Sequence, residues 1–377
     1  MRGAVAWKSP CGMLAPFCSG VSEVYASWTA RPGPPFPAWA GPAERLRFLL
    51  RHAILAPSRF NAQPWDFEID GESVRVHVDR RRALPAADPQ GREATIACGG
   101  AVENLRIAAA HYGHELVVEA RPPRQGEPVA IARLLERRLP TPDEEELFHA
   151  IPVRRTASTF YPRPVTPEEL AELAAATGGT VLLRRLPRWL ARPVAELVAE
   201  ADAMQWSSAR FRREVATWTA SGRRSKDHAG TWRRQGPAGS GGLLRRLVRF
   251  GKRTSREEAN RRLDEQTRTL LLLSSREESP RDWLEVGRAM QRLLLRATAS
   301  GLAVSFLSQP IEVPEVRRRL RHDVGEAGHP QLLLRVGHGP APRPTPRRPV
   351  DLVLRSFSAD IAVEMDLEAV PAGVRTA

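Results

Sequence analysis

The stretch that decides the fold reads Pro57-Ser58-Arg59-Phe60-Asn61-Ala62-Gln63-Pro64-Trp65. It follows a helical pattern of apolar residues over 42–55 and leads into a predicted strand. Because a helix does not continue through Pro57, and the residue before a proline favours extended backbone, this stretch is predicted to form a stiff loop. Binding groups concentrate on loops that a rigid scaffold holds, so the loop is a candidate ligand site.

The size and charge of the chain set limits on what it can be. Its 377 residues exceed one ordinary domain and suit two, and 42% hydrophobic residues can bury a sizeable core. The net charge of +14 invites a nucleic-acid interpretation. However, the basic residues are nearly all arginine and spread along the whole chain, and no familiar nucleic-acid motif is present. We therefore predict no nucleic-acid partner.

The cysteine count and the hydropathy exclude other classes. Cys11, Cys18 and Cys98 form no C-x-x-C pair and no disulfide framework, which predicts a reduced, cytoplasmic, metal-free protein. No apolar run approaches the ~18 residues of a membrane span. Residues 1–40 lack any period, and prolines and a glycine interrupt their only apolar stretch. We interpret them as an unstructured extension or the product of a mis-assigned start.

The rest of the pattern predicts an α+β fold with antiparallel-dominated sheets. A β-hairpin is expected around Asp70-Gly71, and an N-terminal cap at Thr166, with Glu169 three residues later. The prolines and arginines of 122–142 indicate a connector. Helices are predicted at 93–111, 168–176 and 283–300, and strands at 115–119, 180–186, 269–274, 304–307 and 331–336. Helices and strands recur in a similar order in both halves, which suggests a duplication.

Three further segments carry chemistry suited to an anionic ligand. Arginine binds phosphate well because its planar fork can donate to two oxygens at once. Each segment alone is a weak signal in a chain this rich in arginine. They read Arg154-Arg155-Thr156, Pro310-Ile311-Glu312 after a strand, and Arg347-Arg348 between two prolines.

Taken in order, the four segments resemble the nitroreductase family of FMN oxidoreductases. The resemblance covers about 42–354 and is closest to the actinobacterial, fused, two-lobed Acg-like branch. It implies a first lobe over 41–145, a second over 146–360 and a C-terminal tail over 361–377. The two lobes would form an internal pseudo-dimer, so the chain would be a monomer that can dimerise further. Only one set of site segments is present, which implies one FMN per chain.

The resemblance also assigns roles to residues. Arg154, Thr156, Arg347 and Arg348 would hold the FMN phosphate, and Arg155 could join them or face solvent. The loop would line the ring and the ribityl chain, and Glu312 would direct its backbone N–H toward flavin N5. The family usually has a cation where this chain has Ser158, with Arg59 a candidate substitute. The remaining expected cofactor-binding residues are Pro57, Ser58, Asn61, Gln63, Pro310 and Ile311.

These roles imply a cytoplasmic FMN-dependent oxidoreductase that uses NAD(P)H. Its partner would be a small, flat acceptor such as a nitroaromatic or a quinone. The alternative is an FMN-binding protein that stores, sequesters or senses flavin with little turnover. The basic, glycine-rich segment 222–252 is either a solvated loop or a lid over the site.

Overall fold

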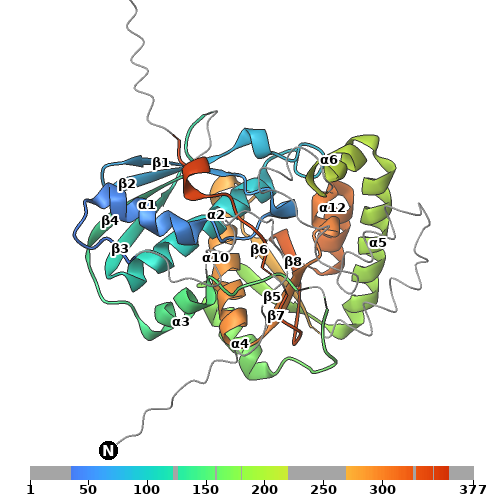
Figure 1. Cartoon of the computed structure of the whole chain (residues 1–377). Coiled ribbons are helices and arrows are strands. Elements are labelled where there is room, and N and C mark those ends of the chain that lie inside the picture. The colour runs from blue at the N-terminus through green and yellow to red at the C-terminus, as the bar shows by residue number, and fades with distance from the viewer. Residues whose placement is uncertain are drawn as a thin grey trace, which may run out of the picture. The chain divides into compact units, whose positions relative to one another are not determined.

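The first half of the chain folds a four-stranded antiparallel sheet against one long helix (Figure 1). The computed structural model describes residues 35–121, 126–157, 159–179, 181–219, 269–325, 328–342 and 344–355. The elements of this half are α1 (Pro42–Ala53), β1 (Trp65–Asp70), β2 (Ser73–Val78), α2 (Arg92–His111), β3 (His114–Ala120) and β4 (Ala130–Arg137). The strand order is β1-β2-β4-β3.

The second half repeats this plan. Its elements are α4 (Pro167–Ala176), β5 (Leu182–Leu186), β6 (Thr269–Ser275), α10 (Pro280–Ala299), β7 (Ala303–Phe306) and β8 (His329–Gly337), and its sheet has the order β5-β6-β8-β7. In both sheets the neighbours are antiparallel, and the long helix connects the second strand to the third. The predicted α+β fold with two sheet-and-helix lobes is confirmed.

Additional helices distinguish the second half from the first. The chain adds α5 (Ala191–Ser207) and α6 (Ala209–Thr219) between β5 and β6, and α11 (Gln309–Glu312) and α12 (Pro314–Asp323) between β7 and β8. Leu271 and Leu273 pack in the core with α10, while Leu270 and Leu272 pack on the other face with α5 and α12. Because both faces are covered, β6 is continuously apolar instead of alternating.

The two long helices, α2 and α10, lie side by side and cross at a pair of glycines (Figure 1). Gly99 and Gly287 are each the eighth residue of their helix. A Cβ atom on Gly99 would lie 2.1 Å from the Leu284 carbonyl oxygen, and one on Gly287 would lie 2.0 Å from the Ile96 carbonyl oxygen. Each clash is with the residue three positions before the other glycine, so the crossing has the pattern of a two-fold interface.

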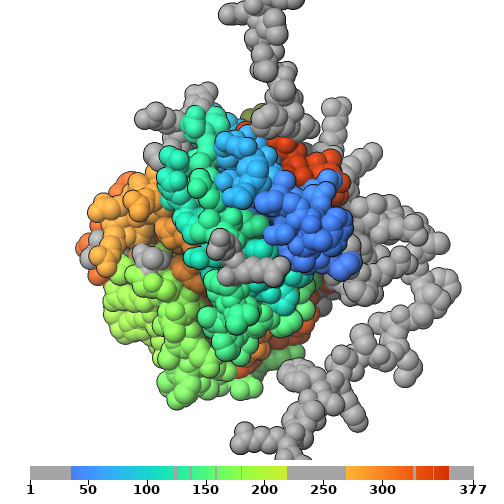
Figure 2. Space-filling view, turned by 90° about the vertical axis from the view of Figure 1, so that its left-hand side faces the viewer, coloured from blue at the N-terminus to red at the C-terminus, as the bar shows by residue number. Residues whose placement is uncertain are grey.

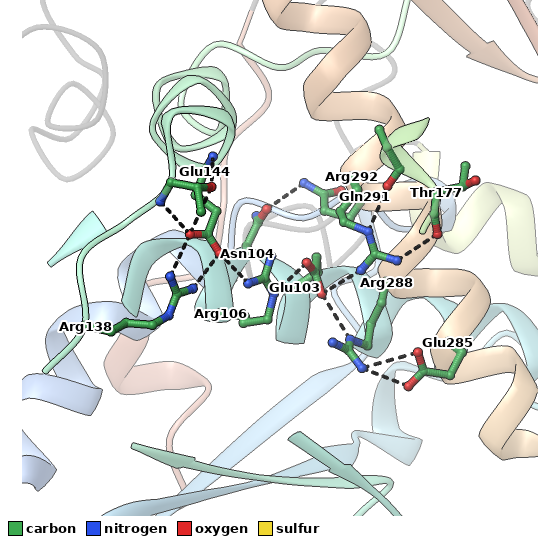
Figure 3. A network of polar contacts seen from close by, with 12 residues as sticks. Glu103, Asn104, Arg106, Arg138, Glu144, Thr177, Glu285, Arg288, Gln291 and Arg292 are labelled. Atoms are coloured by element: carbon green, nitrogen blue, oxygen red, sulfur yellow. Dashed lines mark hydrogen bonds and ion pairs between the residues drawn. The ribbon is translucent and has the colours of Figure 1, made fainter. Parts of the chain in front are cut away.

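A buried ion network fixes the same pair of helices (Figure 3). Glu103 of α2 is fully buried and contacts Arg106 at 2.8 Å, Arg288 at 3.0 Å and Arg292 at 3.2 Å. Burial alone would raise the pKa of Glu103, but the three guanidinium groups outweigh it and lower the pKa to about 2. The carboxylate is therefore charged at neutral pH and ties α2 to α10.

Glu103→Gln should lower the free energy of unfolding by about 3–5 kcal/mol at pH 7, because it leaves buried arginines without their carboxylate. The depressed pKa of Glu103 stabilises the fold above its ordinary value of 4.5, and this stability is lost as the pH falls toward about 2. Urea unfolding between pH 3 and 7 measures both effects. Glu285→Gln, at a half-buried partner of the same Arg288, should cost less than about 1 kcal/mol. Equal losses in the two variants would contradict the assigned role.

The C-terminal arm returns from the second lobe to the first, and Figure 2 shows it in red against the blue N-terminal helix. The Phe67 N–H donates to Val353, and Arg355 donates to the Phe67 carbonyl. Leu354 thereby forms a parallel bridge to the edge strand β1. This return path carries Arg347 and Arg348 to the base of the 57–65 loop.

Several predicted segments need correction. The expected connector 122–142 contains strand β4, in which exposed Arg133 and Leu135 alternate with buried Ala132 and Leu134. Helix α3 (Pro142–Ala150), capped by Thr141, crosses the predicted lobe boundary at 145/146. Helices α5, α6 and α12 were not predicted. The extension 1–40, apart from residues 35–40, lies outside the described residues, as do the 222–252 segment and the 361–377 tail.

Candidate functional site

The 57–65 loop is held in a strained shape. Phe60, Asn61 and Gln63 have φ values of 50°, 54° and 52°, in the left-handed region that L-residues rarely adopt. Each such residue costs about 1–3 kcal/mol and persists only where the surroundings enforce it. Ser58 helps to do so, because its Oγ accepts from the Gln63 N–H at 2.8 Å. A strained polar loop fixed this firmly is typical of a binding site.

The second lobe and its C-terminal arm provide the other restraints on the loop. The Asn61 side-chain amide donates to the Pro346 carbonyl at 2.9 Å. The Arg348 N–H donates to Gln63 Oε1 at 2.8 Å. The Arg59 guanidinium donates to Glu312 at 2.8 Å. The structure thus brings the loop together with two segments that lie far away in the sequence.

Helix α6 covers the loop. Phe60 shares a small apolar cluster with Phe211, Val215 and Trp218 of α6. Glu214 accepts from two backbone N–H groups next to the loop, those of Ala86 and Ala87. Trp218 therefore belongs to a small core against the site.

A cluster of three arginines lies at the predicted phosphate position. Burial, together with Arg154 and Arg155, lowers the pKa of Arg347 to about 9. Burial and Arg155 lower the pKa of Arg154 to about 10. None of the three forms an ion pair within the part of the chain that the structure describes. The Nε atoms of Arg154 and Arg347 are buried and have no hydrogen-bond partner there.

This cluster has the electrostatics of an anion-binding site. Placing like charges together in a buried region is costly unless something negative compensates them. The guanidinium groups of two of these arginines donate to backbone carbonyls. Arg347 donates to those of Leu55 and Ala56, and Arg155 donates to that of Pro152. Among the described residues, the Arg154 guanidinium donates to the Thr156 hydroxyl alone, at 3.4 Å. Unpaired guanidinium N–H groups remain available for an anion such as a phosphate.

Two predicted contacts are arranged differently from expectation. The guanidinium of Arg348 donates to Leu352 and lies 3.6 Å from Asp79, away from the arginine cluster. The Glu312 N–H donates to the Ser308 carbonyl at 3.0 Å, because it closes the single turn of α11. Arg348 thus holds Gln63 in place, and the Glu312 N–H is already engaged.

The assignment of the remaining predicted residues to the site stays a prediction. Pro57, Pro310 and Ile311 are buried. Arg59 is bound to Glu312, so its charge is compensated and it is a poor substitute for the family's missing cation. Ser158, where that cation would stand, lies outside the described residues.

Comparison with known proteins identifies the relatives of this chain. A Mycobacterium tuberculosis protein named "Putative NAD(P)H nitroreductase" is 30% identical, over 83% of this chain and 91% of that protein. The chain belongs to the nitroreductase family. The family model, described as Nitroreductase family, matches residues 151–338. That span includes Arg154 and Glu312 but not the 57–65 loop or Arg347.

Two other members of the nitroreductase family are more distant. The Mycobacterium tuberculosis protein named "Putative NAD(P)H nitroreductase acg" is 27% identical, over 84% of this chain and 96% of that protein. The crystal structure of the FMN and NADPH-dependent nitroreductase NfnB from Sphigopyxis sp. strain HMH is 18% identical, with 56% of this chain and 98% of that chain covered and a TM-score of 0.35. That structural overlap is weak, and no inference rests on it.

Several polar residues near the loop had no predicted role. Glu93 begins α2, and Asp202 and Gln205 lie on α5, an unpredicted helix. Gln205 donates to Glu312 at 2.5 Å. Among these residues, only Glu93 lies in a recognisable sequence feature, the run from Asp88 to Glu93. That run is equally typical of an ordinary helix start, so it did not indicate a site.

Three other features concern the rest of the chain. Cys98 is buried with its Sγ 3.6 Å from the Pro64 carbonyl, and burial raises the pKa of its thiol, as expected for a packing residue. The described residues hold no cluster of potential metal ligands. None of the described helices has the length and apolar character needed to cross a bilayer.

Proposed function

We propose that this chain is an FMN-dependent NAD(P)H oxidoreductase that reduces nitroaromatics, quinones or similar flat acceptors. The observation that carries the proposal is the cluster of Arg154, Arg155 and Arg347. It offers several donors, two of them buried and orphaned, and no carboxylate among the described residues compensates it. A doubly charged phosphate monoester such as that of FMN matches this demand in charge and in hydrogen bonding.

The chain's own residues would share the binding of FMN. Arg154, Arg155 and Arg347 would hold the phosphate. The strained loop, with Pro57, Ser58 and Asn61, would line the ring and the ribityl chain, and the Pro310-Ile311-Glu312 segment would face it from the second lobe. When bound, FMN would take electrons from NAD(P)H and pass them to the acceptor. The protein would contribute rigid positioning and electrostatics.

We infer one FMN per chain, because the arginine at the equivalent position in the first lobe is already paired with a carboxylate. Arg347 of the arginine cluster follows β8, and by the repeated topology its counterpart follows β4. There Arg138 donates to Glu144 at 2.6 and 2.9 Å, so its charge is already compensated. One chain supplies both halves of the intact site, so a monomer is sufficient for binding.

The visible absorption spectrum of the purified protein, with quantification of released flavin, tests this proposal. We expect about one FMN per chain, and rapid bleaching when NADPH is added without oxygen. A flavin spectrum that persists after NADPH and NADH would favour the storage or sensing alternative. A protein that neither retains FMN nor binds added FMN would refute the assignment. Two FMN per chain would refute only the loss of the first-lobe site.

A further inference from the structure

Three buried polar atoms lie where the 57–65 loop meets α11. One is Oε1 of Glu312, whose side chain is 0% exposed and whose Oε2 atom accepts from Arg59 at 2.8 Å and from Gln205 at 2.5 Å. The second is Oε1 of Gln309, and the third is Nε of Arg59. None of the three has a hydrogen-bond partner among the described residues. A buried polar atom in this condition costs free energy, so each of them calls for a partner.

The three atoms belong to one small region. Gln309 and Glu312 are three residues apart in the single turn of α11, so their side chains lie on the same side of that turn. The Glu312 carboxylate contacts the Arg59 guanidinium directly. Gln309 also forms a hydrogen bond to Asp202 of α5, whose carboxyl group interacts with the charges of both Glu312 and Arg59. The loop, α11 and α5 thus bring two free acceptors and one free donor together.

This combination selects the chemistry of a ligand. The two oxygens need two N–H or O–H donors, and the Arg59 Nε–H needs an acceptor. The negative charge of Glu312 disfavours a carboxylate, an ammonium group offers no acceptor, and a ketone or quinone oxygen offers no donor. A primary carboxamide meets the whole demand, because its NH₂ group donates twice and its carbonyl oxygen accepts.

We propose that Glu312, Gln309 and Arg59 bind the carboxamide of the nicotinamide ring of NAD(P)H. This inference rests on the proposed function and deepens it, because NAD(P)H carries its one primary carboxamide on the ring that reacts. The two Oε1 atoms accept from the amide N–H groups, and the Arg59 Nε–H donates to the amide carbonyl. As whole residues all three are partly exposed, so these atoms lie just beneath an accessible surface.

The position of these residues suits that role. Arg59 belongs to the loop, and Glu312 belongs to the Pro310-Ile311-Glu312 segment, and both are proposed to line the flavin ring. A carboxamide held between them fixes the orientation of the nicotinamide beside that ring. The three side chains act by binding and orientation, and they transfer no proton or electron.

Nucleotide binding without turnover tests the assignment. The probes are NAD⁺ or NADP⁺, whichever binds more tightly, and its acetylpyridine analogue, in which a methyl group replaces the amide nitrogen. Neither oxidised nucleotide reduces FMN, so calorimetric titration of the FMN-loaded protein gives equilibrium dissociation constants. We expect the Kd of the analogue to be higher by about 10-fold or more, because two buried acceptors then stay without donors.

Gln309→Met removes one of the two acceptors and fills a similar volume. It should raise the Kd of the natural nucleotide and leave that of the analogue nearly unchanged, so that the ratio of the two constants falls about 3- to 10-fold. Glu312→Gln, which keeps the shape and removes the charge, should also lower the ratio. Gln205→Met is the matched control, because the Gln205 amide contacts only the Oε2 atom of the same carboxylate. Its ratio should remain that of the parent.

The outcomes separate this inference from the proposed function. Equal Kd values for the two nucleotides in the FMN-loaded parent would overturn the inference alone, and water would then be the partner of the three atoms. An equal fall of the ratio in Gln205→Met and Gln309→Met would also overturn it. Discrimination between nitrobenzamide and nitroacetophenone as acceptors, but not between the nucleotides, would refute the assignment to nicotinamide. Failure to bind FMN would overturn the proposed function and this inference with it.

Discussion

Gly287→Ala should remove a large share of the stability of this chain. The added Cβ would lie 2.0 Å from the Ile96 carbonyl oxygen, and only backbone surrounds it there, so no side chain can move aside. The helices α2 and α10 would have to separate along the whole crossing. We expect a loss of more than about 3 kcal/mol, a large share of the 5–15 kcal/mol that holds typical domains together. Urea unfolding and the yield of soluble protein measure the effect.

Gly99→Ala should cause a similar loss, because its Cβ meets the Leu284 carbonyl oxygen at 2.1 Å across the same crossing. The neighbouring Gly100→Ala is the matched control. Its Cβ would lie 3.4 Å from the flexible end of Met290 and 3.6 Å from Ala56, so it should fold with nearly the parent's stability. Equal urea midpoints for the Gly99 and Gly100 variants would show that the two helices do not cross at this glycine pair.

Local backbone features could be predicted from the sequence, whereas the pairing of the two helices could not. Prolines and glycines fix local backbone, so the 57–65 loop and the Asp70-Gly71 hairpin were predictable; Gly71 has the φ of 56° that such a turn needs. A glycine in a helix permits close approach of another helix, but nothing local to Gly99 indicates that its partner is Gly287. That pairing follows from the duplicated topology, which is visible in the sheets and not in any residue identity.

The site was predictable in part for a similar reason. The segments were recognisable, but the direction of each side chain was not. Arg347 and Arg348 are adjacent, and in extended backbone adjacent side chains point to opposite sides. One therefore joins the arginine cluster while the other turns to Asp79 and holds Gln63. The sequence of such a basic pair does not reveal which of the two arginines faces the ligand site.

The acidic side of the site was not predictable at all. Glu93 reads as a favourable acidic residue in the first turn of a helix, where it would be exposed and charged. Burial and repulsion from Glu312 instead raise its pKa, and the position of Glu312 depends on how the two halves of the chain pack. Such contacts have no counterpart in the local pattern of either segment.

Arg154→Met should stabilise the FMN-free protein and weaken FMN binding at the same time. The Arg154 side chain is buried, and its depressed pKa, about 10 against an ordinary 12.5, corresponds to a cost of roughly 3 kcal/mol at 1.36 kcal/mol per pKa unit. Methionine removes that cost and fills a similar volume. The same change removes donors to the phosphate. Each hydrogen bond to a charged group contributes about 1.5–3 kcal/mol, so the Kd for FMN should rise about 10- to 100-fold.

Arg348→Met separates this trade of stability for binding from a general effect of removing a buried arginine. Arg348 is also buried, but Asp79 and two carbonyls, those of Leu352 and Gln63, compensate it. Its loss should therefore destabilise the FMN-free protein, and weaken FMN binding only through the displaced loop. Thermal unfolding with and without FMN measures the stability of each variant, and titration with FMN measures its Kd. If Arg154→Met destabilised the FMN-free protein as much as Arg348→Met, the arginine cluster would not be an uncompensated anion site, and the case for a phosphate there would fail.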